Sequence, residues 1–150
     1  MTTKLLQKDE PIPCELLLLA DETIEAINKY IADSEIYGIE IDHNLAGIYA
    51  LYELSEDDVE IKNIAVSKVL QGKGLGTFLL KDAIAKSKQK GYKNIFIGTA
   101  ETSVYQLKLY QRIGFQRFGI RKNFFLKNYS EPIFEDGILL KDMIMLKIEL

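Results

Sequence analysis

The sequence predicts a mixed α/β fold, and three observations support this prediction. A chain of 150 residues with 47% hydrophobic side chains can bury one core, so we expect a single domain over residues 1–150. Patterns typical of strands and helices alternate along the chain, without an internal repeat, a low-complexity tract or a flexible linker. Two strand–helix–strand units follow one another between Val59 and Ile120, as expected where helices cover a sheet.

The N-terminal part is predicted to contain a helix and a hairpin. Apolar residues recur at helical spacing over Thr23–Asp33, and Asp21 is available as the N-cap. Two segments rich in Ile, Leu and Tyr follow, Ile36–Ile41 and Leu45–Leu54, separated by Asp42-His43-Asn44, which has the composition of a turn. We therefore expect an amphipathic helix followed by two antiparallel strands.

The second half of the chain contains the two strand–helix–strand units. Val59–Val66 first alternates apolar and polar residues and then becomes apolar on both faces, as a central strand does. Glycine follows both predicted helices, as it often does at a helix C-terminus. The predicted elements are a helix over Gly74–Lys90 ended by Gly91, a strand over Asn94–Gly98, a helix over Ser103–Arg112 ended by Gly114, an extended segment Phe115–Ile120, an aromatic segment Lys122–Tyr129 compatible with a helix, and a last strand within Leu139–Leu150.

Charge and composition exclude several kinds of site. A net charge of −3 and a pI near 5.3 disfavour a nucleic-acid partner, which would need clustered basic residues. One cysteine, Cys14, and one histidine, His43, form neither an internal disulfide nor a thiolate-rich zinc site. We expect Cys14 to be a small apolar filler and His43 to be an exposed turn residue. No metal site is predicted.

No segment of the sequence has the pattern of a membrane or export signal. Residues 1–4 lack the apolar segment of a signal peptide, and the apolar run Leu16–Ala20 is too short to span a bilayer. The lone cysteine also fits a reducing compartment. We therefore expect a cytoplasmic protein without a membrane partner.

A glycine-rich turn connects the strand that ends at Val66 to the helix that begins near Gly74. It reads Gln71-Gly72-Lys73-Gly74-Leu75-Gly76 and is followed by Thr77. Glycines let backbone N–H groups approach phosphate oxygens, and a helix N-terminus adds free donors and a positive dipole, so the predicted ligand is a diphosphate. The spacing fits neither the Rossmann nor the Walker motif. The alternative is a helix N-terminus that uses glycine for close packing and binds no ligand.

Two ordered motifs resemble those of the GNAT superfamily of acyl-coenzyme A N-acyltransferases. The first is Q-x-x-G-x-G shortly after Asn63–Val66, and the second is Leu109–Phe115, a helix that carries a tyrosine and ends at Gly-Phe. The resemblance covers Glu40–Gly119, and Glu131–Met145 looks like a bacterial subgroup whose substrates are mostly unassigned. It implies an α+β fold with a strongly twisted, mostly antiparallel mixed sheet of about six or seven strands, flanked by about four helices and splayed between strands 4 and 5.

The same resemblance implies acetyl-CoA as co-substrate, with its pantetheine arm along the strand and its pyrophosphate in the turn. The family often has an asparagine at the position of Ser103, and capping of the helix is the alternative role for this serine. The predicted coenzyme-binding residues are Ile64, Ala65, Val66, Gln71, Gly72, Lys73, Gly74, Leu75, Gly76, Thr77, Ser103 and Tyr110.

Two residues match the family's catalytic groups. Tyr110 matches the phenol that protonates the departing thiolate, although a core tyrosine is the alternative. Glu60 aligns with the general base of some members, and a solvent-facing charge is its alternative. Direct attack by an amine in a ternary complex needs no acyl-cysteine, so the lack of a Cys–His pair does not oppose this chemistry.

The acceptor is expected to be a primary amine on a small molecule or a peptide. Aromatic residues of the tail, Phe124, Phe125, Tyr129 and Phe134, either cap the acceptor pocket or form a homodimer interface. Acidic residues that could border the pocket and attract a cationic amine, or else form a solvated surface, are Glu53, Glu56, Asp57, Asp58, Glu131, Glu135 and Asp136.

Two further functions compete with the acetyltransferase. The first is a sensor or regulatory module that binds acyl-CoA with little catalysis. The second is a structural α/β domain without a ligand, which acetyl-CoA would not stabilise against unfolding.

Overall fold

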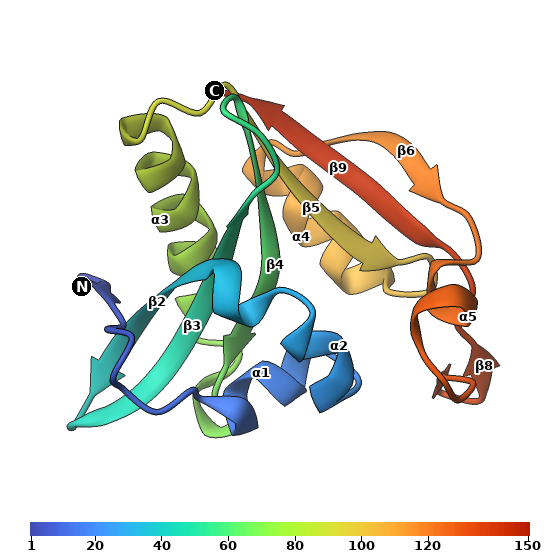
Figure 1. The fold of residues 1–150 in the computed structure, drawn as a ribbon, viewed down its shortest axis with the longest axis horizontal. Helices are drawn as coiled ribbons and strands as arrows, with labels where there is room; N and C mark the ends of the chain where they lie inside the picture. The colour runs from blue at the N-terminus through green and yellow to red at the C-terminus, as the bar shows by residue number, and fades with distance from the viewer.

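A seven-stranded mixed sheet in the order β1-β2-β3-β4-β5-β9-β6 forms the centre of the computed structural model, which describes residues 1–150 (Figure 1). Neighbouring strands are antiparallel except for β4 and β5, which are parallel. The elements are β1 (Lys4–Leu5), α1 (Cys14–Ala20), α2 (Ile24–Asn28), β2 (Ser34–Ile41), β3 (Asn44–Glu53), β4 (Asp58–Val66), α3 (Leu75–Gln89), β5 (Asn94–Ala100), α4 (Val104–Ile113), β6 (Gln116–Arg121), α5 (Phe124–Asn128) and β9 (Met143–Glu149), with 3-10 turns at Ile31–Asp33 and Lys68–Leu70 and a separate hairpin of β7 (Phe134–Glu135) and β8 (Ile138–Leu139).

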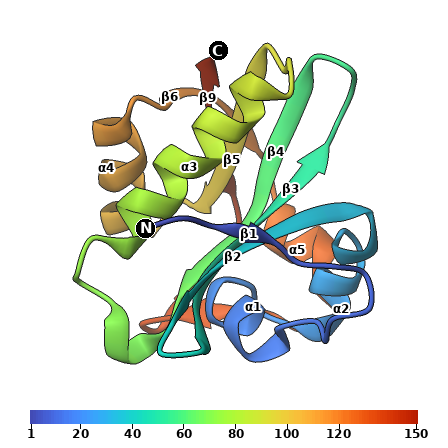
Figure 2. The same ribbon diagram turned by 90° about the vertical axis from the view of Figure 1, so that its left-hand side faces the viewer.

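Helices cover both faces of the sheet, with α3 and α4 on one face and α1 and α2 on the other (Figure 2). The main core, on the α3 side, includes Leu79 and Leu80 of α3 together with Phe115. A smaller core on the opposite face joins Leu17 of α1 and Ile27 of α2 to the sheet. Because β3 and β4 are covered on both sides, both faces of these strands carry apolar residues. The mixed α/β fold predicted from the sequence is confirmed.

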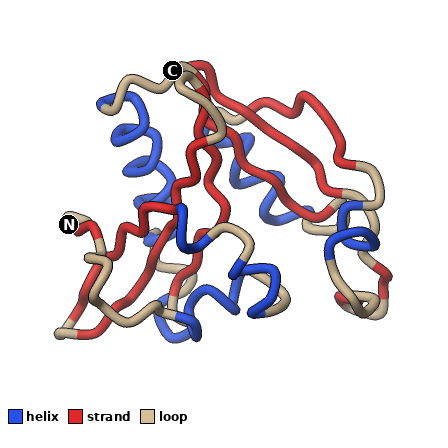
Figure 3. Tube along the Cα trace, in the orientation of Figure 1, coloured by secondary structure: helices blue, strands red, loops and turns tan.

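The two parallel strands β4 and β5 separate after a short paired stretch. Asp58–Ile61 pairs with Asn94–Ile97, and beyond that point the strands diverge (Figure 3). The edge of β4 that faces β5 therefore has no strand partner from Lys62 to Val66. This confirms the splay that the family resemblance implied.

A bulge in β4 coincides with the point of divergence. Opposite Ala50 and Leu51 of β3 stand Asn63 and Ile61, so Lys62 has no partner in the ladder. An extra residue bends a strand and shifts the side chains that follow to the opposite face. Ile61 accordingly packs in the main core, whereas Asn63 contacts the α1–α2 side, and the regular alternation predicted for Val59–Val66 is broken at Lys62.

The N-terminal helices differ from the prediction. α1 was not expected, and the helix predicted over Thr23–Asp33 is divided into α2 and the 3-10 turn Ile31–Asp33. Its N-cap is Thr23, whose hydroxyl accepts the Ala26 N–H at 3.1 Å, and not Asp21. The carboxylate of Asp21 instead accepts hydrogen bonds from the hydroxyls of distant tyrosines, which local sequence does not reveal.

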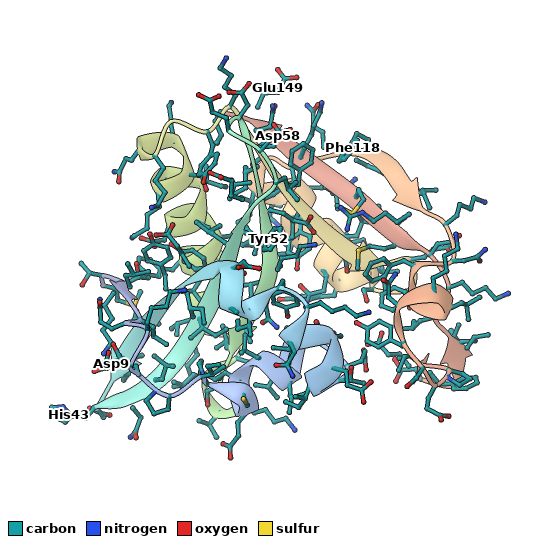
Figure 4. The ribbon with its side chains drawn as sticks, viewed as in Figure 1. Asp9, His43, Tyr52, Asp58, Phe118 and Glu149 are labelled. Carbon is teal, nitrogen blue, oxygen red and sulfur yellow. The ribbon has the colours of Figure 1, made fainter.

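Most other elements match the prediction, with two corrections. The last strand starts at Met143, because Leu139 belongs to the hairpin strand β8. Cys14 is the exposed first residue of α1 and not an apolar filler. His43 is exposed at the tip of the β2–β3 turn with φ 65°, as predicted, and Figure 4 shows it at the edge of the molecule.

Hydrogen bonds fix α3 against the sheet. Asp82 of α3 accepts the Tyr49 hydroxyl of β3 at 2.5 Å, the Thr3 hydroxyl at 2.7 Å and the Lys86 ammonium at 2.8 Å. Burial opposes ionisation of Asp82, but the hydrogen bonds from Lys86, Tyr49 and Thr3 outweigh it and lower the pKa of this carboxyl. The middle of α3 is thus tied to β3 and to the N-terminal segment of the chain.

Close packing of α3 on β3 makes Gly47 intolerant of a larger side chain. A Cβ at Gly47 would lie 2.9 Å from Leu79 Cδ1 and 3.2 Å from the Ala65 carbonyl oxygen. We expect Gly47→Ala to lower the free energy of unfolding by about 1–3 kcal/mol through overpacking. Urea denaturation measures this value.

Gly119→Ala is the matched control, because a Cβ at this strand glycine meets nothing within 4 Å. It should change the free energy of unfolding by less than about 0.5 kcal/mol. Equal effects of the two substitutions would contradict the packing described for β3 and α3.

Candidate active site

A cavity of about 610 Å³ lies where β4 and β5 diverge. Its walls are the second half of β4, the glycine-rich turn, the end of β5 and the inner side of α4. The unpaired edge of β4 contributes backbone N–H and C=O groups that no strand satisfies. No group of His, Cys, Asp and Glu side chains in the chain is arranged to hold a metal ion.

The glycine-rich turn opens onto this cavity. Gly72 has φ 77°, and Gly74, the N-cap of α3, has φ 86°, values at which a side chain is strained. A Cβ at Gly72, Gly74 or Gly76 would meet nothing within 4 Å, so the alternative that these glycines serve close packing is wrong. The turn is braced by the Gln71 side chain, whose Nε2 donates to the Val66 carbonyl at 3.0 Å.

Backbone donors gather at this turn without partners. The N–H groups of Gly72, Lys73 and Gly74 donate no hydrogen bond within the protein. The first N–H groups of α3 also lack partners inside the helix, and the helix dipole adds positive potential at this end. The turn therefore presents a run of free donors suited to an anion with several oxygen atoms, such as a diphosphate.

Tyr110 projects from α4 into the cavity wall. It is 6% exposed, its ring packs edge-on against Phe115, and its hydroxyl has no hydrogen-bond partner in the protein. Burial raises the pKa of Tyr110 to about 12, so the phenol is protonated near neutral pH and can donate a proton.

All but one of the predicted coenzyme-binding residues line this cavity. The exception is Lys73, whose side chain is exposed outside it. Ser103 is the N-cap residue of α4, as the alternative role required, but its side chain makes no capping hydrogen bond. The predicted residues that line the cavity are Ile64, Ala65, Val66, Gln71, Gly72, Gly74, Leu75, Gly76, Thr77, Ser103 and Tyr110.

Glu60 lies in a second, smaller cavity of about 240 Å³. Its side chain is 4% exposed, and Oε1 contacts the Arg121 guanidinium at 3.2 Å and the Lys62 ammonium at 3.3 Å. The alternative of a solvent-facing charge is therefore wrong. Oε2 has no partner in the protein. The residues that line both cavities are Ala20, Ile61, Lys62, Gly98 and Met143, so the two cavities adjoin at the splay.

The predicted acidic border of the acceptor pocket is mostly wrong. Glu53, Asp57 and Asp58, in and beside the β3–β4 turn, lie at the closed end of the splay, where they contact Tyr92, Lys93 and Asn94. Figure 4 shows Asp58 beside Glu149 at that end. Of the seven predicted acids, Glu135 alone lines a cavity, while Glu56, Glu131 and Asp136 are exposed outside both.

Two acidic residues after α1 were not predicted as site residues. Glu22 lines the larger cavity with Glu135, and burial followed by the nearby Glu135 charge raises the pKa of Glu22. Asp21 lines the smaller cavity. In the sequence these residues are visible only as a pair of acids directly after the apolar run Leu16–Ala20. Their position beside β4 depends on tertiary contacts, which the sequence does not reveal.

The aromatic tail covers the smaller cavity. Phe124 and Tyr129 line it, whereas the buried Phe125, whose ring stacks on Tyr129, lines the larger cavity. Phe134 is 62% exposed. The capping role of the tail fits this arrangement.

Comparison with known proteins agrees with this geometry. Residues 3–115 match the Acetyltransferase (GNAT) family. Over 136 residues the chain is 44% identical to an uncharacterized N-acetyltransferase of Bacillus subtilis (strain 168), a match that covers 91% of this chain and 88% of the relative.

Two solved structures are similar over nearly their whole length. A GNAT family acetyltransferase from Elizabethkingia anophelis, with acetyl-CoA bound, has a TM-score of 0.95 and 47% identity, covering 99% of this chain and 97% of that chain. IAA acetyltransferase from Bacillus cereus ATCC 14579 has a TM-score of 0.92 and 40% identity, covering 99% of both chains. The family match, the close relative and the shared fold lead to one conclusion: this chain belongs to the GNAT family of acetyltransferases.

Proposed function

We propose that this enzyme transfers the acetyl group of acetyl-CoA directly to a primary amine of a small molecule or a peptide. The observation that supports this best is the run of free N–H donors at Gly72–Thr77, which opens into the cavity between β4 and β5. A similar acetyltransferase, at 47% identity, has acetyl-CoA bound. None of the helices here is long and apolar enough to cross a bilayer, and we propose a cytoplasmic location.

In this proposal the coenzyme occupies the larger cavity. The free N–H groups of the turn and of α3 hold its pyrophosphate, and the unpaired edge of β4 beside Ile64 and Val66 holds its pantetheine arm. When bound, acetyl-CoA supplies an activated thioester. An unpaired N–H on β4 is suited to stabilise the charge that develops on the carbonyl oxygen during attack.

Tyr110 is proposed as the proton donor to the departing thiolate. Its hydroxyl is free of protein partners, and its pKa of about 12 keeps it protonated through the working range of pH. Among the buried side-chain polar atoms without a partner the Tyr110 hydroxyl is absent, so this hydroxyl is accessible from the cavity that Tyr110 lines.

Glu60 is proposed as the group that takes the proton from the amine, directly or through water. Glu60 lines the smaller cavity, which adjoins the coenzyme cavity at Ile61 and Gly98. Contacts of Oε1 with Lys62 and Arg121 orient the carboxylate. The acceptor amine would therefore approach from the side of the sheet covered by α1 and α2.

Gly74→Ala tests the coenzyme cradle. The new Cβ projects into the open space where the phosphate oxygens would lie, so we expect at least about a tenfold loss of CoA affinity, the value of one charge-assisted hydrogen bond. Titration calorimetry with CoA measures this affinity.

Gly91→Ala is the matched control at the other end of α3. Gly91 also has positive φ, 91°, and open space around its Cβ position. Both substitutions should cost about 1–2 kcal/mol of stability, but Gly91→Ala should change the affinity less than twofold. Equal CoA affinities for the two variants would exclude the proposed cradle.

Tyr110→Phe tests the proton donor. We expect kcat to fall about 10²- to 10⁴-fold while the KM for acetyl-CoA stays within about threefold. Because the pKa of Tyr110 is raised to about 12, the phenol should deprotonate, and the wild-type rate fall for that reason, only as the pH approaches about 12. Thiol release on addition of amines measures the rate.

Tyr92→Phe controls for the loss of a phenol, because Tyr92 lies at the closed end of the splay and bonds to Glu53. It should leave kcat unchanged. Full turnover by Tyr110→Phe at every pH would rule out the proposed role.

Glu60→Gln tests the base. We expect kcat at neutral pH to fall about 10²-fold or more and the acidic limb of the pH–rate profile to change shape. Glu53→Gln, an exposed substitution at the last residue of β3, opposite Val59 at the closed end of the splay, is the control. An unchanged profile for Glu60→Gln, with the variant folded by circular dichroism, would eliminate this residue as the base.

A further inference from the structure

Two carboxylates line the smaller cavity, and they differ in whether a cation neutralises their negative charge. Glu60 contacts the cations of Lys62 and Arg121. Asp21 has no cation within 4 Å, although its position is fixed. Tyr129 donates to its Oδ1 at 2.6 Å, Tyr30 donates to its Oδ2 at 3.0 Å, and the Glu22 N–H donates to Oδ1 at 2.7 Å.

The tyrosines that hold Asp21 do not neutralise it. Burial, above all, raises the pKa of both Tyr30 and Tyr129, so each phenol keeps its proton and acts as a donor. A half-buried anion fixed by neutral donors attracts a cation with matching hydrogen bonds, such as an ammonium. The other cation in the cavity wall, Lys29, donates to the Asn128 carbonyl at 3.0 Å.

Aromatic rings line the same cavity as this anion. Tyr30, Tyr52, Phe124 and Tyr129 all line the cavity. The Lys62 ammonium already lies 5.4 Å from the centroid of the Tyr52 ring, so a cation against an aromatic face exists in this wall. A volume of about 240 Å³ suits a small organic amine.

A hydrogen-bond chain connects Asp21 to the splay. The Tyr30 hydroxyl accepts the Asn63 Nδ2–H at 3.1 Å, and Asn63 lies in β4 in the wall of the larger cavity. Asn63 is 4% exposed, and its Oδ1 is buried without a partner.

We propose that Asp21 binds the ammonium of the acceptor in the aromatic cavity formed by Tyr30, Tyr52, Phe124 and Tyr129. The inference rests on the proposed function and deepens it: the acceptor is a small cationic primary amine with an apolar or aromatic body. Asp21 determines specificity for the charge, while proton removal belongs to Glu60. The aromatic tail closes the site through Tyr129, which lines the cavity and donates a hydrogen bond to Asp21.

Binding of 2-phenylethylamine and 2-phenylethanol to the CoA-loaded enzyme tests the charge preference without relying on turnover. The two probes share a body and differ in the ammonium. We expect the amine to bind at least about tenfold more tightly than the alcohol to wild type. In Asp21→Asn this ratio should fall to less than about threefold, with CoA affinity unchanged.

Asp33→Asn is the control, because Asp33 is an exposed residue of the neighbouring 3-10 turn and lines neither cavity. It should retain the wild-type ratio. If wild type and Asp21→Asn showed the same ratio of amine affinity to alcohol affinity, the proposal would be overturned. A parallel loss of CoA affinity in Asp21→Asn would also overturn it, because Asp21 would then act by holding the fold together.

Turnover gives a second readout. In a thiol-release assay with 2-phenylethylamine, Asp21→Asn should raise the KM for the amine at least about tenfold and change the KM for acetyl-CoA less than twofold. If wild type binds the amine selectively but releases no thiol with any amine, the proposed catalysis fails and the ammonium site stands. If wild type acetylates amines without preferring the amine probe, the ammonium site fails and the catalysis stands.

Discussion

The divergence of β4 from β5 is the constraint on which the site depends. Parallel strands gain their stability from continuous pairing, yet this pair stops at Ile61 and Ile97. The bulge at Lys62 bends β4 away, and cores on both faces hold the separated strands in place. A cavity with unsatisfied backbone groups at its centre is the result, and such groups favour a ligand that can pair with them.

Each side of the divergence has a different chemistry. On the α3 and α4 side, free N–H donors and a protonated phenol suit an anionic cofactor and a thiolate leaving group. On the α1 and α2 side, Asp21 and Glu60 lie among aromatic rings and suit a cationic nucleophile. The sheet keeps these two environments apart, and they meet where Ile61 and Gly98 line both cavities.

The features that could be predicted from the sequence are those encoded locally. The glycine-rich turn has positive φ at Gly72 and Gly74, and glycine is the residue that adopts such φ values without strain, so the sequence alone indicates the turn. Helical spacing likewise predicted that Tyr110 lies near the end of α4. The two motifs together identified the family.

The features that were missed depend on contacts between distant segments. The burial of Glu60 follows from the bulge at Lys62 and from Arg121, which lies 61 positions along the chain. Asp21 had the local pattern of a helix cap, but its role comes from Tyr129, 108 positions away. Acids such as Asp58 were placed at the acceptor pocket because the sequence does not reveal which end of β4 is open.

Backbone amide shifts on titration with CoA test the central claim most directly, because they report the cradle and the open edge of β4 at the same time. Large shifts are expected for amides of residues 72–77 and 64–66, and none for the amides around Asp57 and Lys93 at the closed end of the splay. Saturable binding that leaves the amides of residues 72–77 unmoved would contradict this claim.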